Sequence, residues 1–232
     1  MRNQAVVFIA AVSGVLLITW GFSIKSFDVL EKSGYILEFN DKDQIKPKFQ
    51  KAFSAITTGP KCSLARVCPS DHFALRISSG AANVVGPKIC FDGKIIMSNA
   101  LNNVGPGLNI VVVNGKNGKV EKYGFLNMNY GNEEYILAFL KEIQPGMIVL
   151  VASFDDVTPK MTDDMREVFI GMGSTLIKSV KQRDSWVFVG KSGTEHKSLF
   201  EKQAVNDEKT NVYEEWPEMV ELSGCIPRTP TD

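Results

Sequence analysis

Residues 108–128, LNIVVVNGKNGKVEKYGFLNM, decide the fold of this 232-residue chain. The almost uninterrupted apolar run over 108–113 is typical of a strand that is buried on both faces. The two Asn-Gly pairs within 114–118 suit the left-handed backbone conformations of a tight turn. Residues 120–128 then return as a second strand. The stretch therefore predicts two strands joined by a tight turn.

Further strand signals flank this stretch on both sides. Polar and apolar residues alternate over 72–78, which favours a strand. The Asp92-Gly93 pair is the strongest short signal for a hairpin, and it lies between residues 88–90 and 94–97. Three more strands are expected, over residues 147–152, 185–190 and 218–222.

Helices are expected at three places between the later strands. Asn132 and Thr162 can each cap a helix, and each is followed by two acidic residues that suit a helix N-terminus. A short third helix is expected over 197–204. Because strands dominate and two or three short helices interrupt them, the sequence predicts an α+β fold with two mainly antiparallel sheets.

Composition excludes several classes of function. Hydrophobic residues make up 44% of the chain and charged residues 22%, which is typical of a globular protein. Lys and Arg number 26 and so do Asp and Glu; this balance argues against a nucleic-acid partner. With two histidines and no G-x-S-x-G, H-E-x-x-H or Gly-rich phosphate motif, we expect neither an enzyme nor a cofactor.

The N-terminus carries a secretory signal. Arg2 precedes an uncharged run from Asn3 to Ile24, and we expect residues 1–24 to be a signal peptide that is cleaved somewhere after Trp20, near residues 20–26. The run is also near the minimum length for a membrane span, so a retained signal anchor stays open as the alternative, and only then is the membrane a partner. We expect a loosely structured stalk or propeptide over 25–60, a folded domain over 61–227 and a tail over 228–232.

Four cysteines make an even set in a chain bound for an oxidising compartment. Two disulfides are therefore expected among Cys62, Cys68, Cys90 and Cys225. Three pairings are possible, and spacing does not choose between them. A zinc site is disfavoured because the paired Cys-x2-4-Cys spacing is missing, so no metal is expected.

Two polar clusters are candidates for ligand binding. Asp155 and Asp156 follow a predicted buried strand and could bind a sugar hydroxyl or calcium or serve acid–base chemistry; the alternative is a pair of turn-forming residues. Arg183 precedes the next predicted strand and Trp186 lies near its start. An aromatic ring beside polar groups suits a sugar. The alternative is a core tryptophan. All four gather only if the two strands run antiparallel, because a parallel crossover would separate them.

Seven short motifs follow one another in a specific order along residues 61–227. They are Lys61-Cys62, Cys68-Pro69, residues 79–90, residues 102–105, residues 154–156, residues 183–188 and residues 224–227. In this order they resemble the "family with sequence similarity 3", the secreted cytokine-like proteins, and residues 80–87 resemble its interleukin-like EMT inducer branch most.

The resemblance implies a fold, a pairing of the cysteines and a function. The fold would be a compact β-β-α domain, two antiparallel sheets lined by short helices, also called the GG-type lectin domain. The disulfides would be Cys62–Cys90 and Cys68–Cys225. The function would be extracellular signalling through a cell-surface receptor or a glycan, with a carbohydrate-binding module without a signalling role as the alternative.

Four positions depart from the family pattern. Pro106 stands where Arg is usual, Asn127 and Asn132 stand where Asp is usual, and Glu215 replaces a Gly before Trp216. One cation and two anions are therefore missing from these loops, and their polar surface differs from that of the family.

Overall fold

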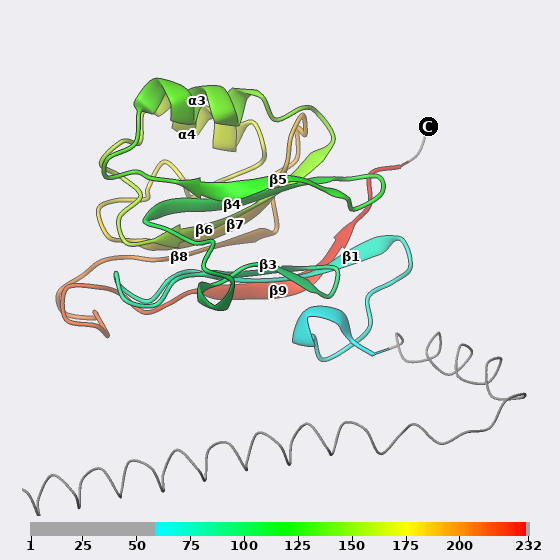
Figure 1. The fold of residues 1–232 in the computed structure, drawn as a ribbon, viewed down its shortest axis with the longest axis horizontal. Helices are drawn as coiled ribbons and strands as arrows, with labels where there is room; N and C mark the ends of the chain where they lie inside the picture. Colours follow the sequence, from blue (N-terminus) through cyan, green and yellow to red (C-terminus); the bar gives the residue numbers. More distant parts are fainter. Residues whose placement is uncertain (1–58, 231–232) are drawn as a thin grey trace, which may run out of the picture. The chain divides into compact units, whose positions relative to one another are not determined.

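The computed structural model describes residues 59–230. In this part of the chain two antiparallel sheets form two layers, and two helices cover the outer face of the larger sheet (Figure 1). The predicted signal peptide and residues 25–58 of the predicted stalk lie outside the described residues. Within residues 59–230, no helix is long and apolar enough to span a bilayer.

The smaller sheet confirms the predicted hairpin and the strand over 72–78. Asp92 and Gly93 both have positive φ angles, 46° and 90°, as the tight two-residue turn between β2 and β3 requires. The last strand begins three residues later than predicted and ends at Pro227, because its register is set by pairing with β1. In spatial order the strands are β3 (Lys94–Met97), β2 (Lys88–Phe91), β1 (His72–Ser78) and β9 (Glu221–Pro227).

The larger sheet contains the stretch that opened the argument. β4 lies inside this sheet and is buried from its first residue through Val113, as the apolar run predicts. Ile110 and Val112 face the helices, whereas Val111 and Val113 face the smaller sheet, so both faces of the strand need apolar side chains. In spatial order the strands are β5 (Val120–Leu126), β4 (Gly107–Asn114), β6 (Met147–Phe154), β7 (Ser185–Lys191) and β8 (Phe200–Ala204).

Two of the three predicted helices are confirmed, with their caps. In α3 (Glu133–Lys141) the Asn132 side chain accepts a hydrogen bond from the Tyr135 amide at 2.8 Å. In α4 (Asp163–Ile170) the Thr162 hydroxyl accepts one from the Met165 amide at 3.3 Å. Both caps satisfy amides that the first helical turn leaves without partners. Two single 3-10 turns complete the helical elements of the described residues, η1 (Lys61–Ser63) and η2 (Asn99–Leu101).

The predicted third helix, over 197–204, is wrong. Residues 200–204 form the edge strand β8, which pairs with β7 from Ser185↔Ala204 to Val189↔Phe200. The run Phe-Glu-Lys-Gln-Ala contains good helix formers, but the ladder hydrogen bonds offered by the open edge of β7 override that weak local preference.

Both disulfides have the pairing that the resemblance implied. Cys62–Cys90 links η1 to β2 over a sequence separation of 28. Cys68–Cys225 links the segment before β1 to β9 over a separation of 157. The second bridge therefore closes nearly the whole described domain into one loop.

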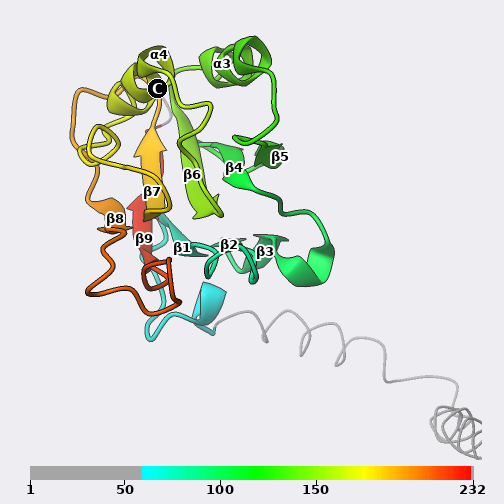
Figure 2. The ribbon, with the colours of Figure 1, turned by 90° about the vertical axis from the view of Figure 1, so that its left-hand side faces the viewer.

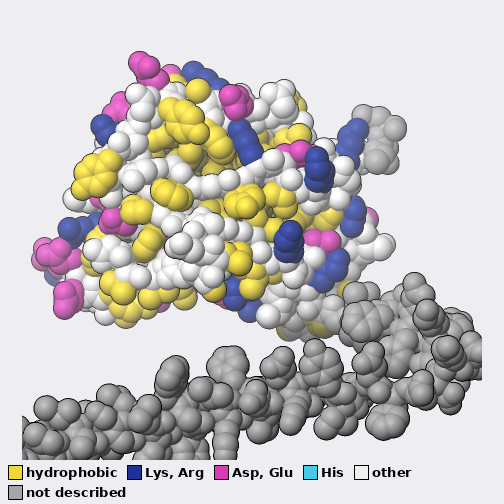
Figure 3. All heavy atoms as spheres, in the orientation of Figure 1, with side chains coloured by type: hydrophobic (Ala, Val, Ile, Leu, Met, Phe, Trp, Pro, Cys, Tyr) yellow, Lys and Arg dark blue, Asp and Glu magenta, His cyan; other side chains and the backbone are white. Residues whose placement is uncertain are grey.

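The two sheets diverge at one side of the sandwich. Between the edge strands β3 and β5 they leave a groove, and hydrophobic side chains gather there on the face shown in Figure 3. Ile95, Leu101 and Tyr123 line it and are each about half exposed. The groove is the open end of the core between the two sheets.

Candidate functional site

The candidate site lies where β6 ends and β7 begins. These strands are antiparallel neighbours, from Ile148↔Lys191 to Ala152↔Val187, although α4 lies between them in sequence. Their arrows point in opposite directions in Figure 2, which looks onto this side of the domain. Asp155 and Arg183 therefore come to one edge of the sheet, which meets the condition that the sequence left open. We call it the β6–β7 edge.

Loops from other strands converge on the β6–β7 edge. The Asp155 amide donates to the carbonyl of Ala82, in the turn that follows β1, at 3.4 Å. Asn129, in the loop after β5, donates its side-chain amide to the Asp155 carboxylate at 3.0 Å. Pro106 directly precedes Gly107, the first residue of β4, which pairs with Phe154. Asp155 thus lies among three loops that are distant in sequence.

Asp155 and Arg183 share an uncommon backbone conformation. Their φ angles are 58° and 61°, in the left-handed region that non-glycine residues rarely occupy. Such conformations cost on the order of 1–3 kcal/mol each and persist where the surrounding structure imposes them, often at binding sites. Both side chains are partly exposed at the edge.

Asp156 turns away from the solvent. The residue is only 7% exposed, and one carboxylate oxygen accepts hydrogen bonds from the Thr158 amide at 2.9 Å and the Thr158 hydroxyl at 2.7 Å. This is the turn-forming role that stood as the alternative in the sequence. Asp156 therefore shapes the loop beside Asp155.

Trp186 lies in the core, and this corrects its assignment as a ligand contact in favour of the alternative that the sequence left open. It is fully buried, stacks on Phe188 with ring centroids 5.6 Å apart and meets Phe169 edge-on at 5.5 Å. Its indole N–H donates to the Glu201 carboxylate at 3.0 Å. A sugar has no access to either ring face, so the core-tryptophan alternative describes this residue.

Arg183 has partners that the sequence did not indicate. Its guanidinium lies 4.8 Å from the ring centroid of Trp216 and forms an ion pair with Glu215. Both partners lie in the tight turn from Tyr213 to Trp216, which is closed by two backbone hydrogen bonds of 3.0 Å. Glu215 stood out in the sequence only as a departure from the family pattern, and nothing local connects it with a residue 32 positions away.

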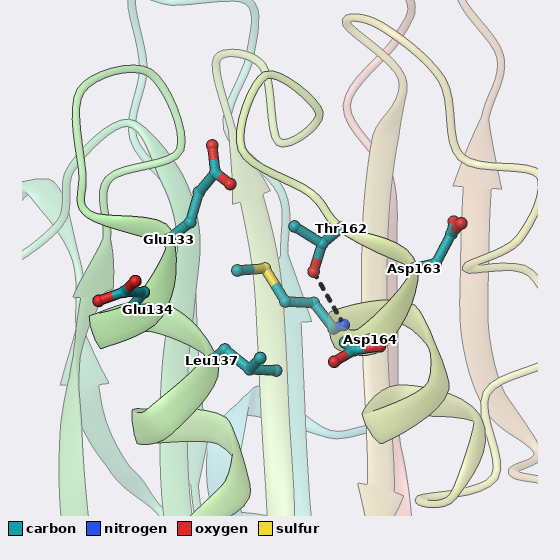
Figure 4. Close-up of a pocket in the computed structure, with 7 residues that line it drawn as sticks. Glu133, Glu134, Leu137, Thr162, Asp163 and Asp164 are labelled. Carbon is teal, nitrogen blue, oxygen red and sulfur yellow. Dashed lines mark hydrogen bonds between the residues drawn. The ribbon is translucent and has the colours of Figure 1, made fainter.

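Away from the β6–β7 edge, a pocket with acidic residues at its rim lies between the first turns of α3 and α4 (Figure 4). Its acidic residues suit the positive ends of the two helix dipoles. Two of these acids are also paired, Glu133 with Lys160 and Asp164 with Lys141. Across residues 59–230, no three His, Cys, Asp or Glu side chains group together as a metal site would need.

Comparison with known proteins finds similar sequences over most of the chain. A family model described as "Interleukin-like EMT inducer" matches residues 106–194. "Protein FAM3C" of Danio rerio is 47% identical over 176 residues, which cover 75% of this chain and 78% of the relative. "Protein FAM3D" of Mus musculus is 48% identical over 172 residues, 74% of this chain and 77% of the relative.

One similar protein spans almost the whole sequence. "Protein FAM3C" of Xenopus laevis is 43% identical over 228 residues, which cover 97% of this chain and 96% of the relative. At this identity and coverage the fold and the ancestry are shared. The chain belongs to the FAM3 family, the "family with sequence similarity 3".

Proposed function

We propose that this protein is a secreted, cytokine-like signalling protein that recognises a hydroxyl-rich ligand, such as the glycan of a cell-surface receptor, at the β6–β7 edge. Membership of a family whose model is described as an interleukin-like inducer supports the signalling role. Two disulfides and the apolar N-terminal run support secretion, since disulfides persist in oxidising compartments.

One observation carries the choice of this surface. Asp155 and Arg183 leave neighbouring antiparallel strands at the same edge, and each is held in a left-handed conformation that costs free energy. Charged residues on loops that a rigid sheet positions are the usual material of a binding site. The carboxylate can accept hydrogen bonds from sugar hydroxyls, and the guanidinium can donate to ring and hydroxyl oxygens.

Tyr130 is the aromatic residue that we propose in place of Trp186. It is 90% exposed, and its amide donates to the side chain of Asn127 at 2.9 Å, which fixes the loop after β5. Its neighbour Asn129 is the residue bonded to Asp155. An exposed ring on a fixed loop beside a carboxylate offers an apolar face and a polar anchor, which is what a sugar requires.

We propose binding without catalysis. Hydrolysis of a glycoside needs two carboxyl groups that face each other across the scissile bond. Asp156 is bonded to Thr158 within its own loop, so it is not placed as the second group opposite Asp155. A carbohydrate-binding module without a signalling role remains the second candidate, because the same surface would serve it.

A glycan array tests the proposed surface. We expect Asp155→Asn, Arg183→Gln and Tyr130→Ala each to lower binding about tenfold or more, because each removes a direct contact with the ligand. Glu121→Gln is the matched control, since Glu121 is exposed at the opposite end of β5. Unchanged binding in Asp155→Asn and Arg183→Gln would contradict the proposed surface. If variants that no longer bind glycan still signal, the signalling surface is separate from the glycan-binding surface at the β6–β7 edge.

A further inference from the structure

The positive group of the β6–β7 edge is already occupied by groups of the protein itself. One face of the Arg183 guanidinium lies over the Trp216 ring, and the Glu215 carboxylate binds its edge. A carboxylate on a guanidinium is the same charge-assisted bond that an acidic ligand would form there. Glu215 thus occupies one guanidinium nitrogen, Nη1, that a ligand carboxylate or sulfate would also use.

The backbone holds Glu215 in this place. The turn from Tyr213 to Trp216 is closed by reciprocal backbone hydrogen bonds, and Glu214 within it has a φ of 56°. The start of the same loop is also fixed, because the Asn206 amide donates to the Asp184 carboxylate at 2.7 Å. Asp184 is the residue directly after Arg183, so the loop and the arginine share one anchor.

The charges around Arg183 also disfavour a negatively charged ligand. Arg183 is partly exposed, with 33% of its side chain accessible, and Glu215 is 73% exposed. Glu214 and Asp155 add two further negative charges in the loops of the β6–β7 edge, and Lys181 adds one positive charge. An incoming anion would therefore meet charge repulsion and would have to displace the Glu215 carboxylate, whereas a neutral ligand meets no repulsion and can use the guanidinium N–H groups that Glu215 leaves free.

We infer that Glu215 is an internal anion that determines the specificity of this edge: it makes the site select neutral sugars over sulfated or carboxylated ones. The inference rests on the proposed function and names the ligand class of that same site. Because Glu215 is tethered next to Arg183, its effective concentration there is high, and a free anion competes with it poorly.

The first test uses inorganic sulfate as the probe and needs no sugar. The NMR signal of the Arg183 side-chain N–H is followed while sulfate replaces chloride at constant ionic strength. We expect Glu215→Gln to bind sulfate about three- to fivefold more tightly than the unaltered protein, the range that an exposed ion pair allows. Glu214→Gln is the matched control, since it removes the same charge one residue away, and it should change binding less than twofold.

The second test compares a neutral oligosaccharide with its sulfated form. Glu215→Gln should gain affinity for the sulfated form only, and adding Arg183→Gln should abolish the gain. An equal gain in Glu214→Gln, or no gain in Glu215→Gln, would overturn the inference. If the sulfate titration behaves as expected while no sugar binds any variant, the proposed function fails but the occupation of Arg183 by Glu215 stands. Glu215→Gly, which also removes the carboxylate, repeats the comparison, and thermal melting verifies that each variant is folded.

Discussion

Asp184 offers the sharpest test of how the β6–β7 edge is held. The residue is 1% exposed, and its carboxylate accepts three hydrogen bonds. One oxygen accepts from the Lys181 amide at 2.8 Å and from the Gln203 side chain at 2.7 Å, and the other accepts from the Asn206 amide at 2.7 Å. Asp184→Asn keeps the shape of the side chain but replaces one of these oxygens by an NH2 group.

The loss of stability expected for Asp184→Asn follows from the hydrogen-bond donors that surround the side chain. In the better orientation the asparagine oxygen keeps two bonds, and the NH2 group faces the Asn206 amide, which leaves a buried donor unsatisfied at about 1–3 kcal/mol. The two remaining bonds lose their ionic character, which removes roughly 1 kcal/mol each. We therefore expect the free energy of unfolding to fall by about 3–5 kcal/mol, a large part of the total for a domain.

Urea unfolding followed by circular dichroism measures this loss. Asp163→Asn is the control, because Asp163 lies exposed in the first turn of α4 and its charge is worth about 1 kcal/mol or less there. Asp184→Asn should also broaden the NMR signals of residues 206–216, since Asp184 anchors the start of this loop through the Asn206 amide. A loss below about 1 kcal/mol would refute the reasoning that the buried carboxylate holds this loop.

Two further predictions concern covalent and backbone constraints. Cys225→Ser should lower the free energy of unfolding by about 2–5 kcal/mol and reduce secretion, because Cys68–Cys225 closes a separation of 157 residues; unchanged stability in chemical denaturation would contradict it. Gly107→Ala should cost more than about 2 kcal/mol in thermal unfolding, because a Cβ there would lie within 3.0 Å of the Leu126 carbonyl and φ is 100°; a melting temperature within about 2 °C of the original would argue otherwise.

Local signals were sufficient for most elements of the fold. The hairpin at Asp92-Gly93, the buried strand β4 and the two capped helices all depend on residues within a few positions of one another. The two elements that sequence misplaced, β8 and the start of β9, depend on partners elsewhere. β8 forms because β7 offers an open edge, and β9 takes its register from β1. A periodic pattern contains no information about either partner.

The candidate site was predictable only in part, because local patterns do not show which distant residues contact it. The sequence correctly placed Trp186 at the start of a strand, but it did not show that β7 is covered on both faces and has no solvent-facing side over its first six residues. The sequence therefore left Trp186 open between a ligand contact and a core residue, and its burial decides for the core. Asn129 and Glu215 were missed as partners because each reaches its charged residue across a long stretch of sequence.

The direction of β7 depends on the return of the chain after α4. The helix leads from the β6–β7 edge to the opposite edge, where the Met172 carbonyl accepts from the Lys191 amide at 3.2 Å. The chain must then run back before β7 begins. Arg166 of α4 holds this return segment, because its guanidinium donates to the carbonyls of Ile177 and Val180. The helix and the irregular return segment together cross the sheet twice, so β7 pairs antiparallel with β6 rather than parallel.

The same geometry explains why Asp155 and Arg183 come to the same edge. A simple strand–helix–strand unit would place them at opposite edges, separated by the length of the strands. The return segment, which carries no regular secondary structure and whose contacts with Arg166 are to backbone carbonyls, brings them to one edge. The β6–β7 edge is thus created by an irregular segment that periodicity does not reveal, and two of its charged residues, Asp155 and Arg183, have left-handed backbone conformations.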